Sequence, residues 1–469
     1  MFPAIVEGKL AHFRIYHNMK TNKKIYIIGI GGISLSALAV LLQDKGAWVK
    51  GSDLSHNSQV DELLQKGFDI VIGHSTAFVL WADEIILSAA VPENDCDVEF
   101  AKKLGKKIIT RAEALGWLSS QYRTISVSGC HGKTTTTGMI STILLDANKK
   151  PNIHIGGILN QIKSNVCEGE SDILVTEACE YKDSFLSLSS EIGVILNVKP
   201  DHLDYFLNFD NVKRSFNKFA QNVNPNGTLV LNADDETCQK IMKSPFIQCK
   251  MLSFGILSPC DIQATNIYEY ENGKFAFLCK LSGEQVEFHL PVYGYHNIYN
   301  ALASIAVCVQ FGLTPLQVQQ GIENFKGISR RFEKVFEDKN KIVIHDYAHH
   351  PDEIKASIQA GRKLKKDKII AIFQPHTFSR TKDFFDEFCQ SLMLADEVWL
   401  LPIYPAREKP IKDISSYKIY KNIKKNNKKT RYFKDFYSIY KKIKNLQEDC
   451  LVLILGAGDI EDLARMLQG

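Results

Sequence analysis

The stretch RTISVSGCHGKTT, residues 123–135, decides the fold of this chain of 469 residues. A short β-branched run is followed by a glycine loop, and a helical pattern begins near Lys133. Loop N–H groups and the positive end of a helix dipole together form a site for anions. The stretch therefore predicts a nucleotide-phosphate loop, in which Lys133 contacts the β- and γ-phosphates and the Thr134 hydroxyl contacts Mg²⁺. Val127 occupies the place of the first glycine of a standard P-loop, so this is a shorter variant; the alternative is a tight structural turn.

A second glycine loop lies toward the N-terminus, in KKIYIIGIGGIS, residues 23–34. It follows a buried strand and precedes a helix, as a dinucleotide-binding loop does, and Asp53 ends the next strand. Ser34 replaces the third glycine of that fingerprint. Because a separate nucleotide loop follows, the pattern favours another diphosphate over NAD.

Apolar strand patterns alternate with helical patterns along the whole chain, which predicts an α/β fold with mostly parallel sheets. We expect three domains. They are a Rossmann-like domain over residues 1–121, a central domain over 122–326 that carries the P-loop-type phosphate loop, and a Rossmann-like domain over 327–469. Residues 261–292 alternate as antiparallel strands do.

Composition and charge argue against several classes of protein. The formal net charge is +4, too small to indicate nucleic acid, and the basic stretch 418–434 is interpreted as a solvated helix and loop. The 11 cysteines are odd in number and have no CxxC spacing, which fits a reducing compartment. Residues 1–20 lack the apolar core of a signal peptide, and no run of about 18 apolar residues exists. We expect a cytoplasmic protein that does not enter membranes, as a monomer or a weak homodimer.

Two strand patterns that follow the phosphate loop end at polar residues. Glu177 ends the strand pattern ILVTE, where a carboxylate faces the ligand crevice of an α/β sheet and could hold Mg²⁺. Glu180 and Asp183 are nearby rivals, and a capped surface Glu is the plain alternative. His202, after VILNVKPD, is a metal ligand, a proton carrier or a loop residue.

The last third of the chain carries two polar strand ends, HDYAHHP (345–351) and QPHTFSR (374–380). Clustered His, Asp and Arg there predict a polar cleft, whereas zinc lacks the matching ligand spacing. Arg330 and Arg331 lie at the expected hinge near residues 327–331. A guanidinium there could clamp a γ-phosphate after domain closure, or it is an ordinary linker charge.

Taken together and in this order, the motifs resemble the Mur ligase family over nearly the whole chain. GCHGKTTT resembles the family's ATP loop, EACEYKDSF its Mg²⁺-binding segment, NVKPDHLDYF its DHLDY-type segment and GYHNIYNALASIA its GxHNxxNALAA helix. The segments RRFE, DYAHHP, FQPHTFSRT, YPAREKP and GAGDI are similar to the alanine-adding member in particular. The match separates the chain less well from the close relative that recycles murein tripeptide, which tends to carry a different residue in place of Phe332 and Phe in place of Tyr347.

The resemblance implies an ATP- and Mg²⁺-dependent ligase that joins L-alanine to the lactyl carboxylate of UDP-N-acetylmuramate through an acyl phosphate. This would be the first peptide step of peptidoglycan precursor synthesis. The resemblance also implies that the domain over 1–121 binds the UDP-sugar, that the central domain over 122–326 is an ATPase domain, and that the domain over 327–469 closes on ATP and the amino acid. It implies catalytic roles for Lys133, Glu177, His202 and Arg331, and metal ligands at Thr134, Glu177 and His202. ATP would contact Gly129, Cys130, His131, Gly132, Lys133, Thr134, Thr135, His296, Asn297, Arg330 and Asp346. The other substrates would contact Gly29, Gly31, Gly32, Ser34, Asp53, His74, Ser88, Tyr347, His349, His376 and Arg380.

Two departures from the family pattern have consequences. Cys130 replaces the usual Thr of the ATP loop, and its position beside Lys133 and a helix N-terminus predicts a lowered thiol pKa and inactivation by thiol reagents, with protection by ATP. Where some members carry a carbamylated lysine, the register falls on Phe216, so no carbamate is expected. The competing interpretations are the tripeptide-recycling ligase, an NAD-dependent oxidoreductase built on the first glycine loop, and a nucleotide-binding regulatory protein without catalysis.

Overall fold

The structure is a computed structural model that describes residues 22–406, 408–426 and 429–468. Residues 1–20, which we expect to lack a signal peptide, lie outside the described residues, as do Arg407 of the YPAREKP motif and two residues of the basic stretch. Among the described residues, no helix is long and apolar enough to cross a membrane.

The N-terminal sheet has the strand order β3-β2-β1-β4-β5, and all its pairings are parallel. Its middle strand β1 reads KIYII and is buried on both faces, as central parallel strands are. Strands β2 and β3 lie on one side of β1, and β4 and β5 lie on its other side, so the switch point of the strand order is between β1 and β4. Ligands of such sheets bind beyond the carboxyl ends of the strands at this point. The strands are β1 (Lys24–Ile28), β2 (Trp48–Asp53), β3 (Asp69–Ile72), β4 (Glu84–Leu87) and β5 (Lys107–Thr110). The helices are α2 (Ile33–Asp44), α3 (Ser58–Gln65), α4 (Thr76–Trp81), α5 (Cys96–Lys103) and α6 (Arg111–Ser119).

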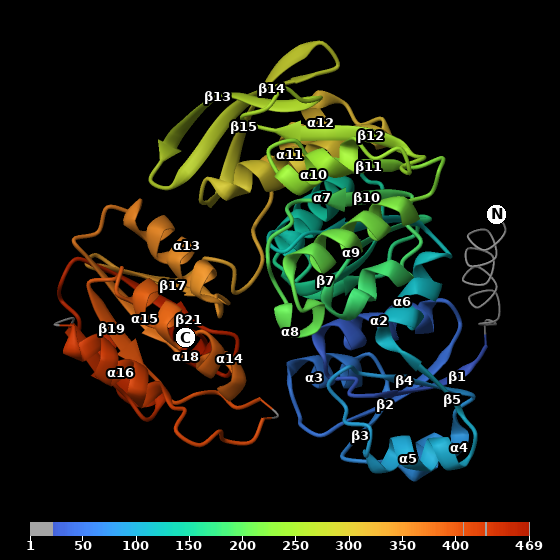
Figure 1. Cartoon of the computed structure of the whole chain (residues 1–469), viewed down its shortest axis with the longest axis horizontal. Helices are drawn as coiled ribbons and strands as arrows, with labels where there is room; N and C mark the ends of the chain where they lie inside the picture. The colour runs from blue at the N-terminus through green and yellow to red at the C-terminus, as the bar shows by residue number, and fades with distance from the viewer. Residues whose placement is uncertain (1–21, 407, 427–428, 469) are drawn as a thin grey trace. The chain divides into compact units, whose positions relative to one another are not determined.

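The central sheet has the order β15-β14-β13-β12-β11-β10-β6-β9-β7-β8, with a parallel middle from β13 to β7. Two-residue connections join β13 to β14 and β14 to β15, the length of hairpin turns, in agreement with the predicted antiparallel stretch. Helices α7, α11 and α12 pack side by side on this sheet (Figure 1). The strands are β6 (Arg123–Ser128), β7 (Asn152–Leu159), β8 (Ser164–Cys167), β9 (Ile173–Glu177), β10 (Ile192–Ile195), β11 (Thr228–Asn232), β12 (Lys250–Gly255), β13 (Ile262–Glu271), β14 (Lys274–Leu281) and β15 (Glu284–Tyr293). The helices are α7 (Lys133–Asp146), the 3₁₀ helix η1 (Tyr181–Ser187), α8 (Leu203–Phe206), α9 (Phe209–Asn222), α10 (Glu236–Met242), α11 (His296–Cys308) and α12 (Pro315–Glu323).

The C-terminal sheet has the order β16-β17-β21-β18-β19-β20, and only its edge pair β16–β17 is antiparallel among the described pairings. Its register sets Asp346, at the end of β17, beside Leu455 of β21, which in turn pairs with Phe373 of β18. The polar residues that follow these three strands therefore gather at one edge. The strands are β16 (Glu333–Glu337), β17 (Lys341–Asp346), β18 (Lys368–Phe373), β19 (Glu397–Leu400), β20 (Lys429–Tyr432) and β21 (Cys450–Leu455). The helices are α13 (Pro351–Arg362), α14 (Phe378–Asp383), α15 (Phe385–Leu392), α16 (Ser416–Lys425), α17 (Phe436–Lys444) and α18 (Glu461–Gln468).

These sheets confirm the predicted α/β class with three mostly parallel domains. The chain divides into two compact units, the first with the N-terminal sheet and most of the central one, the second with the C-terminal sheet and the tips 268–276 and 292–295 of the hairpin strands. In the first unit, Leu38 of α2, Leu118 of α6 and Phe185 of η1 belong to one apolar core, so the first two sheets share that core. The predicted boundaries at 121 and 326 stay a prediction.

Candidate active site

The predicted phosphate loop joins β6 to α7, as the sequence indicates. Gly129 has φ +137° and Gly132 has φ +88°, so the loop turns through backbone conformations that only glycine adopts without strain. Gly132 is the N-cap of the 14-residue α7, and no side chain of the described residues caps that end. The first N–H groups of α7 therefore remain available to an anion. Thr134 is buried, Thr135 is half-buried and His131 is exposed on this first turn.

Lys133 is held beneath the loop that precedes it. Its Nζ donates to the Gly129 carbonyl at 2.6 Å and to both oxygens of Glu180 at 2.9 and 3.0 Å. Burial by itself would lower the pKa of Lys133, but the Glu180 carboxylate outweighs it and the pKa is raised. Lys133 therefore keeps its positive charge at every physiological pH, in the position where phosphate charge would be neutralised.

Asn197, to which the sequence pattern assigned no role, fixes the shape of the phosphate loop. It follows β10, the strand that pairs with β6. Its carbonyl accepts from Cys130 N at 3.2 Å, its Oδ1 accepts from His131 N at 3.0 Å, and its Nδ2 donates to the His131 carbonyl at 2.9 Å. A polar residue at the end of the neighbouring parallel strand was the signal that could have identified it.

The helix α11 supports the other side of the loop. A Cβ on Gly132 would lie 2.5 Å from Asn300 Oδ1, so the loop and this helix touch. Thr136 Oγ1 donates to the same oxygen at 3.2 Å, and Asn300 Nδ2 donates to Asn297 Oδ1 at 2.8 Å. His296 and Asn297, predicted to contact ATP, are thereby anchored at the start of α11, close to the phosphate loop.

Two carboxylates of the EACE segment have different partners. Glu177 ends β9, and its Oε1 accepts from Gly156 N of β7 at 2.7 Å. Glu180, the rival considered in the sequence, is 1% exposed and pairs with Lys133. Glu180, Asp201 and His202 each offer a ligand atom, and these atoms lie within 4.8 Å of one another. Carboxylate oxygens are the ligands that Mg²⁺ prefers, so this group, next to the Thr134 turn, fits a divalent cation.

The predicted lowering of the Cys130 thiol pKa is wrong. The thiol is 8% exposed, and it donates to the Lys199 carbonyl at 3.3 Å and accepts from Lys199 N at 3.2 Å. Burial, and next the Glu180 charge, raise the pKa of Cys130 to about 12, and the opposing effect of Lys133 is smaller. The local pattern suggested an electropositive thiol, but it could not show that the thiol faces the protein interior.

We expect Cys130 to resist alkylation in the folded protein at neutral pH, because it is neither ionised nor accessible. Brief treatment with iodoacetamide followed by peptide mass mapping measures this. The exposed Cys96 is the internal control and should react first. Labelling of Cys130 at the rate of Cys96 would contradict the buried geometry.

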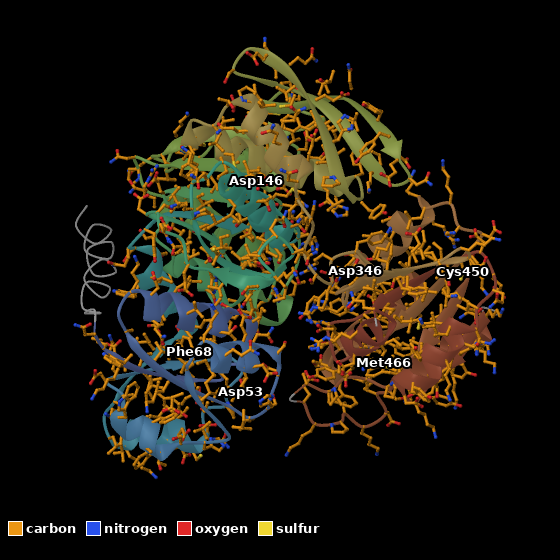
Figure 2. All side chains as sticks on the ribbon, turned by 180° about the vertical axis from the view of Figure 1, so that it is seen from behind. Asp53, Phe68, Asp146, Asp346, Cys450 and Met466 are labelled. Atoms are coloured by element: carbon orange, nitrogen blue, oxygen red, sulfur yellow. The ribbon has the colours of Figure 1, made fainter. Side chains whose placement is uncertain are left out.

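The N-terminal glycine loop lies at the switch point of its sheet. Asp53, labelled in Figure 2, ends β2, and its Oδ2 accepts from Gly31 N at 3.0 Å. A Cβ on Gly29 would lie 2.9 Å from Ser88 Cβ, so the loops after β1 and β4 are in contact. Gly32 is the N-cap of α2, and no side chain of the described residues caps it. The structure thus brings Gly29, Gly31, Gly32, Asp53 and Ser88 together, whereas His74 follows β3 and faces Asp95 and Asp97.

Ser34 connects this loop to the central sheet through His154, a residue that the sequence did not single out. His154 of β7 is 3% exposed, and its Nε2 lies 3.0 Å from both the Ser34 carbonyl and Ser34 Oγ. Its Nδ1 lies 2.9 Å from Thr176 Oγ1 of β9, and Arg111 Nη1 donates to Ser34 Oγ at 3.1 Å. Burial lowers the pKa of His154 to about 4, so a neutral imidazole joins the N-terminal glycine loop to β7 and β9 of the central sheet.

The second unit holds the remaining predicted residues at the strand ends of its sheet. Asp346 (Figure 2) accepts a hydrogen bond from Ser357 Oγ, and burial raises its pKa to about 6. The guanidinium carbons of Arg330 and Arg331 lie 5.0 and 5.2 Å from the centre of the Tyr347 ring. Arg330 also pairs with Glu461 of α18 at 2.7 Å. The Arg331 guanidinium is therefore more available to a ligand than that of Arg330.

The two histidine motifs of this unit, which follow β17 and β18, lie close together. The rings of His349 and His376 lie 6.2 Å apart, and His376 stacks on Tyr404 at 5.6 Å. Burial, followed by the Arg380 charge, lowers the pKa of His376 to about 4, and burial also lowers the pKa of His349. His376 Nδ1 has no hydrogen-bond partner among the described residues. Tyr347, His349, His376 and Arg380 thus form one cluster of neutral imidazoles beside a cation.

Comparisons with known proteins follow the same three-part division. The family models of the Mur ligase catalytic domain, the Mur ligase middle domain and the Mur glutamate ligase domain match residues 24–123, 127–308 and 330–458. A UDP-N-acetylmuramate–L-alanine ligase of Caldicellulosiruptor bescii is 40% identical over 441 residues, 93% of this chain and 96% of the relative. That of Caldanaerobacter subterraneus is 42% identical over 444 residues, 94% and 96% of the two chains.

Solved structures agree with this assignment. The UDP-N-acetylmuramate–alanine ligase of Thermotoga maritima superposes with a TM-score of 0.81 at 28% identity, over 95% of this chain and 98% of that one. A murein peptide ligase of Psychrobacter arcticus superposes with a TM-score of 0.71 at 22% identity, over the same shares of the two chains, which supports the fold alone.

Proposed function

The chain belongs to the Mur ligase family, and we propose that it joins L-alanine to the lactyl carboxylate of UDP-N-acetylmuramate at the expense of ATP. One observation carries the proposal. The phosphate loop with Lys133 beneath it lies in a chain that matches alanine-adding ligases over 93% of its length. The oxidoreductase interpretation of the first glycine loop fails, because the relatives are ligases and a second nucleotide loop lies in the same unit.

The first step is phosphoryl transfer. The lactyl carboxylate oxygen attacks the γ-phosphorus of ATP, the bond to the β-phosphate bridge oxygen breaks, and ADP leaves with that electron pair. Lys133 and the N–H groups at the start of α7 hold the phosphates in line and stabilise the charge that spreads over them. Glu180, Asp201 and His202 would hold Mg²⁺, and the family resemblance adds the Thr134 hydroxyl and Glu177 as further ligands. Such a cation offsets phosphate charge when bound.

The second step forms the amide. The amine of L-alanine attacks the acyl carbonyl carbon, phosphate leaves with the bond electrons, and the nitrogen gives up a proton. On this proposal, the second unit serves the amino acid and the nucleotide ribose. The neutral imidazoles of His349 and His376 are proton acceptors, Arg380 pairs with the alanine carboxylate, and Asp346 accepts from the ribose. Arg331 would meet the migrating phosphoryl group.

The N-terminal glycine loop would hold the diphosphate of the sugar nucleotide. Its contacts to Asp53 and to His154 fix the loop before any ligand arrives, which reduces the ordering cost of binding.

We expect His154→Ala to raise KM for UDP-N-acetylmuramate about tenfold with little change in kcat, because Ser34 loses a contact that holds the loop. His154→Gln, which keeps a polar group at that place, should recover part of the effect. Steady-state kinetics with the sugar nucleotide as the varied substrate measures the split. A lower melting temperature with unchanged KM would show that His154 is merely structural.

Phosphate release tests the function itself. Reactions containing ATP, Mg²⁺ and UDP-N-acetylmuramate are supplemented with L-alanine, with the murein tripeptide or with neither. We expect release that requires L-alanine. Release only with the tripeptide would move the chain to the recycling branch of the family, and none with either amine would make it a regulatory nucleotide-binding protein.

A further inference from the structure

A group of side chains away from the phosphate loop has the chemistry of a transition-metal site. His74 follows β3, Asp95 precedes α5 and Cys96 is the first residue of that helix. One imidazole nitrogen, one carboxylate oxygen and one sulfur from these residues lie within 4.8 Å of one another. The three donor types are different, which distinguishes the group from a surface cluster of acids.

Helix capping orients Asp95 within the group. Its Oδ1 accepts from Asp97 N at 3.0 Å and from Val98 N at 3.3 Å, as an N-cap residue does. The other oxygen, Oδ2, lies 3.6 Å from His74 Nδ1. The fold therefore holds one carboxylate oxygen in place against the imidazole, while Cys96 is a free and exposed thiol beside it.

Asp97 supplies an independent observation. It is fully buried, and its Oδ2 accepts from Tyr26 OH at 2.7 Å and from Ser75 N at 2.8 Å. That oxygen also lies 3.8 Å from His74 Nδ1, whereas Oδ1 has no hydrogen-bond partner among the described residues. A buried carboxylate is costly to keep charged, and a cation bound through His74, whose Nδ1 lies 3.8 Å from Asp97 Oδ2, offsets part of that cost.

We propose that His74, Asp95 and Cys96 bind a thiophilic divalent cation of the Zn²⁺ class, with Asp97 as the buried carboxylate behind His74. A thiolate with an imidazole and one carboxylate favours Zn²⁺ or Co²⁺ over Mg²⁺ and Ca²⁺, which prefer oxygen ligands. As the metal–sulfur bond forms, the Cys96 thiol loses its proton to solvent. Three protein ligands leave a fourth position for water, so the site is open. This site is separate from the Glu180 group and does not rest on the proposed ligase activity.

A different arrangement would satisfy the same carboxylates. A protonated His74 imidazolium could pair with Asp95 and Asp97 without any metal. Only the metal site makes a bond to sulfur, so a sulfur-specific signal separates the two arrangements.

Cobalt titration of the chelator-treated full-length protein provides this signal, with Mg²⁺ in excess to occupy oxygen-rich sites. We expect one equivalent of Co²⁺ to produce a thiolate-to-cobalt charge-transfer band in the near ultraviolet, and Zn²⁺ to abolish it by displacement. Cys96→Ser should remove the band, and His74→Gln should weaken binding by at least about tenfold. Cys167→Ser, which changes a half-buried cysteine of β8, is the matched control and should keep the band.

His74 and Cys96 are both exposed, so we expect the variants at these two positions to fold normally. Absence of the band at saturating Co²⁺ would overturn the proposal in favour of the imidazolium pair. An equal band in Cys96→Ser, or full affinity in His74→Gln, would overturn it as well, because the metal would then be bound elsewhere or by the cysteine alone.

Discussion

Lys133→Met is expected to lower kcat/KM for ATP by about a hundred- to a thousandfold, because the ammonium is the fixed charge beneath the phosphate loop. Methionine has a similar length and no charge, so the loop keeps its packing. Steady-state kinetics measures the loss. The substitution also leaves the buried Glu180 carboxylate without its partner, which should lower the free energy of unfolding by about 3 kcal/mol.

A second substitution separates the two effects of Lys133→Met. In the double variant Lys133→Met with Glu180→Gln, no buried charge is left unpaired, so we expect most of the stability to return while activity stays lost. Lys240→Met is the matched control, because its ion pair with Glu236 is exposed and contributes little to stability. Recovery of activity along with stability in the double variant would show that Lys133 acts only through folding and that Glu180 is not a required metal ligand.

Gly132→Ala is expected to raise KM for ATP about a hundredfold and to lower kcat as well. The added methyl group would lie 2.5 Å from Asn300 Oδ1 and 3.2 Å from Leu196 Cδ1, on a residue with φ +88°. Either the loop moves or Asn300 does, and the link from Asn300 to Thr136 is strained in both cases. A displacement of about 1 Å at a site that positions reacting groups costs about this much.

Gly105→Ala controls for backbone strain. Gly105 has φ +63°, and no atom lies within 4 Å of the place that a Cβ would occupy, so the methyl group meets open space. We expect this variant to lose about 1 kcal/mol of stability and to keep its kinetics. If ATP binding by Gly132→Ala equals that of Gly105→Ala, the contact between the loop and α11 has no role in shaping the site.

The sequence allowed prediction of the features that depend on neighbouring residues. The strand–loop–helix pattern around Gly129 and Gly132 is local, because positive φ and a free helix N-terminus follow from residue type and order. The parallel rhythm of strands and helices is local in the same sense, and it predicted three mostly parallel sheets. The strand-end motifs that contain Asp346 and His376 lie at the same edge of the sheet, because the carboxyl ends of parallel strands share one edge.

Other features depend on contacts that spacing does not encode. His154 and Ser34 are far apart in the chain and meet only because α2 packs against β7. Glu180 rather than Glu177 pairs with Lys133, and the Glu177 carboxylate accepts from Gly156 N of β7 instead. Cys130 has the local pattern of a reactive thiol, yet its burial reverses the direction of its pKa shift. Side-chain partners across two sheets require the packed structure.

The mass of the reaction product tests the central claim most directly. The protein is incubated with ATP, Mg²⁺, UDP-N-acetylmuramate and L-alanine, and the sugar nucleotide is then analysed by mass spectrometry beside the adenine nucleotides. We expect UDP-N-acetylmuramoyl-L-alanine with one ADP and one phosphate for each amide formed, and about a hundred- to a thousandfold slower formation of these products with Lys133→Met. An unmodified sugar nucleotide, or AMP and pyrophosphate in place of ADP and phosphate, would contradict the assignment.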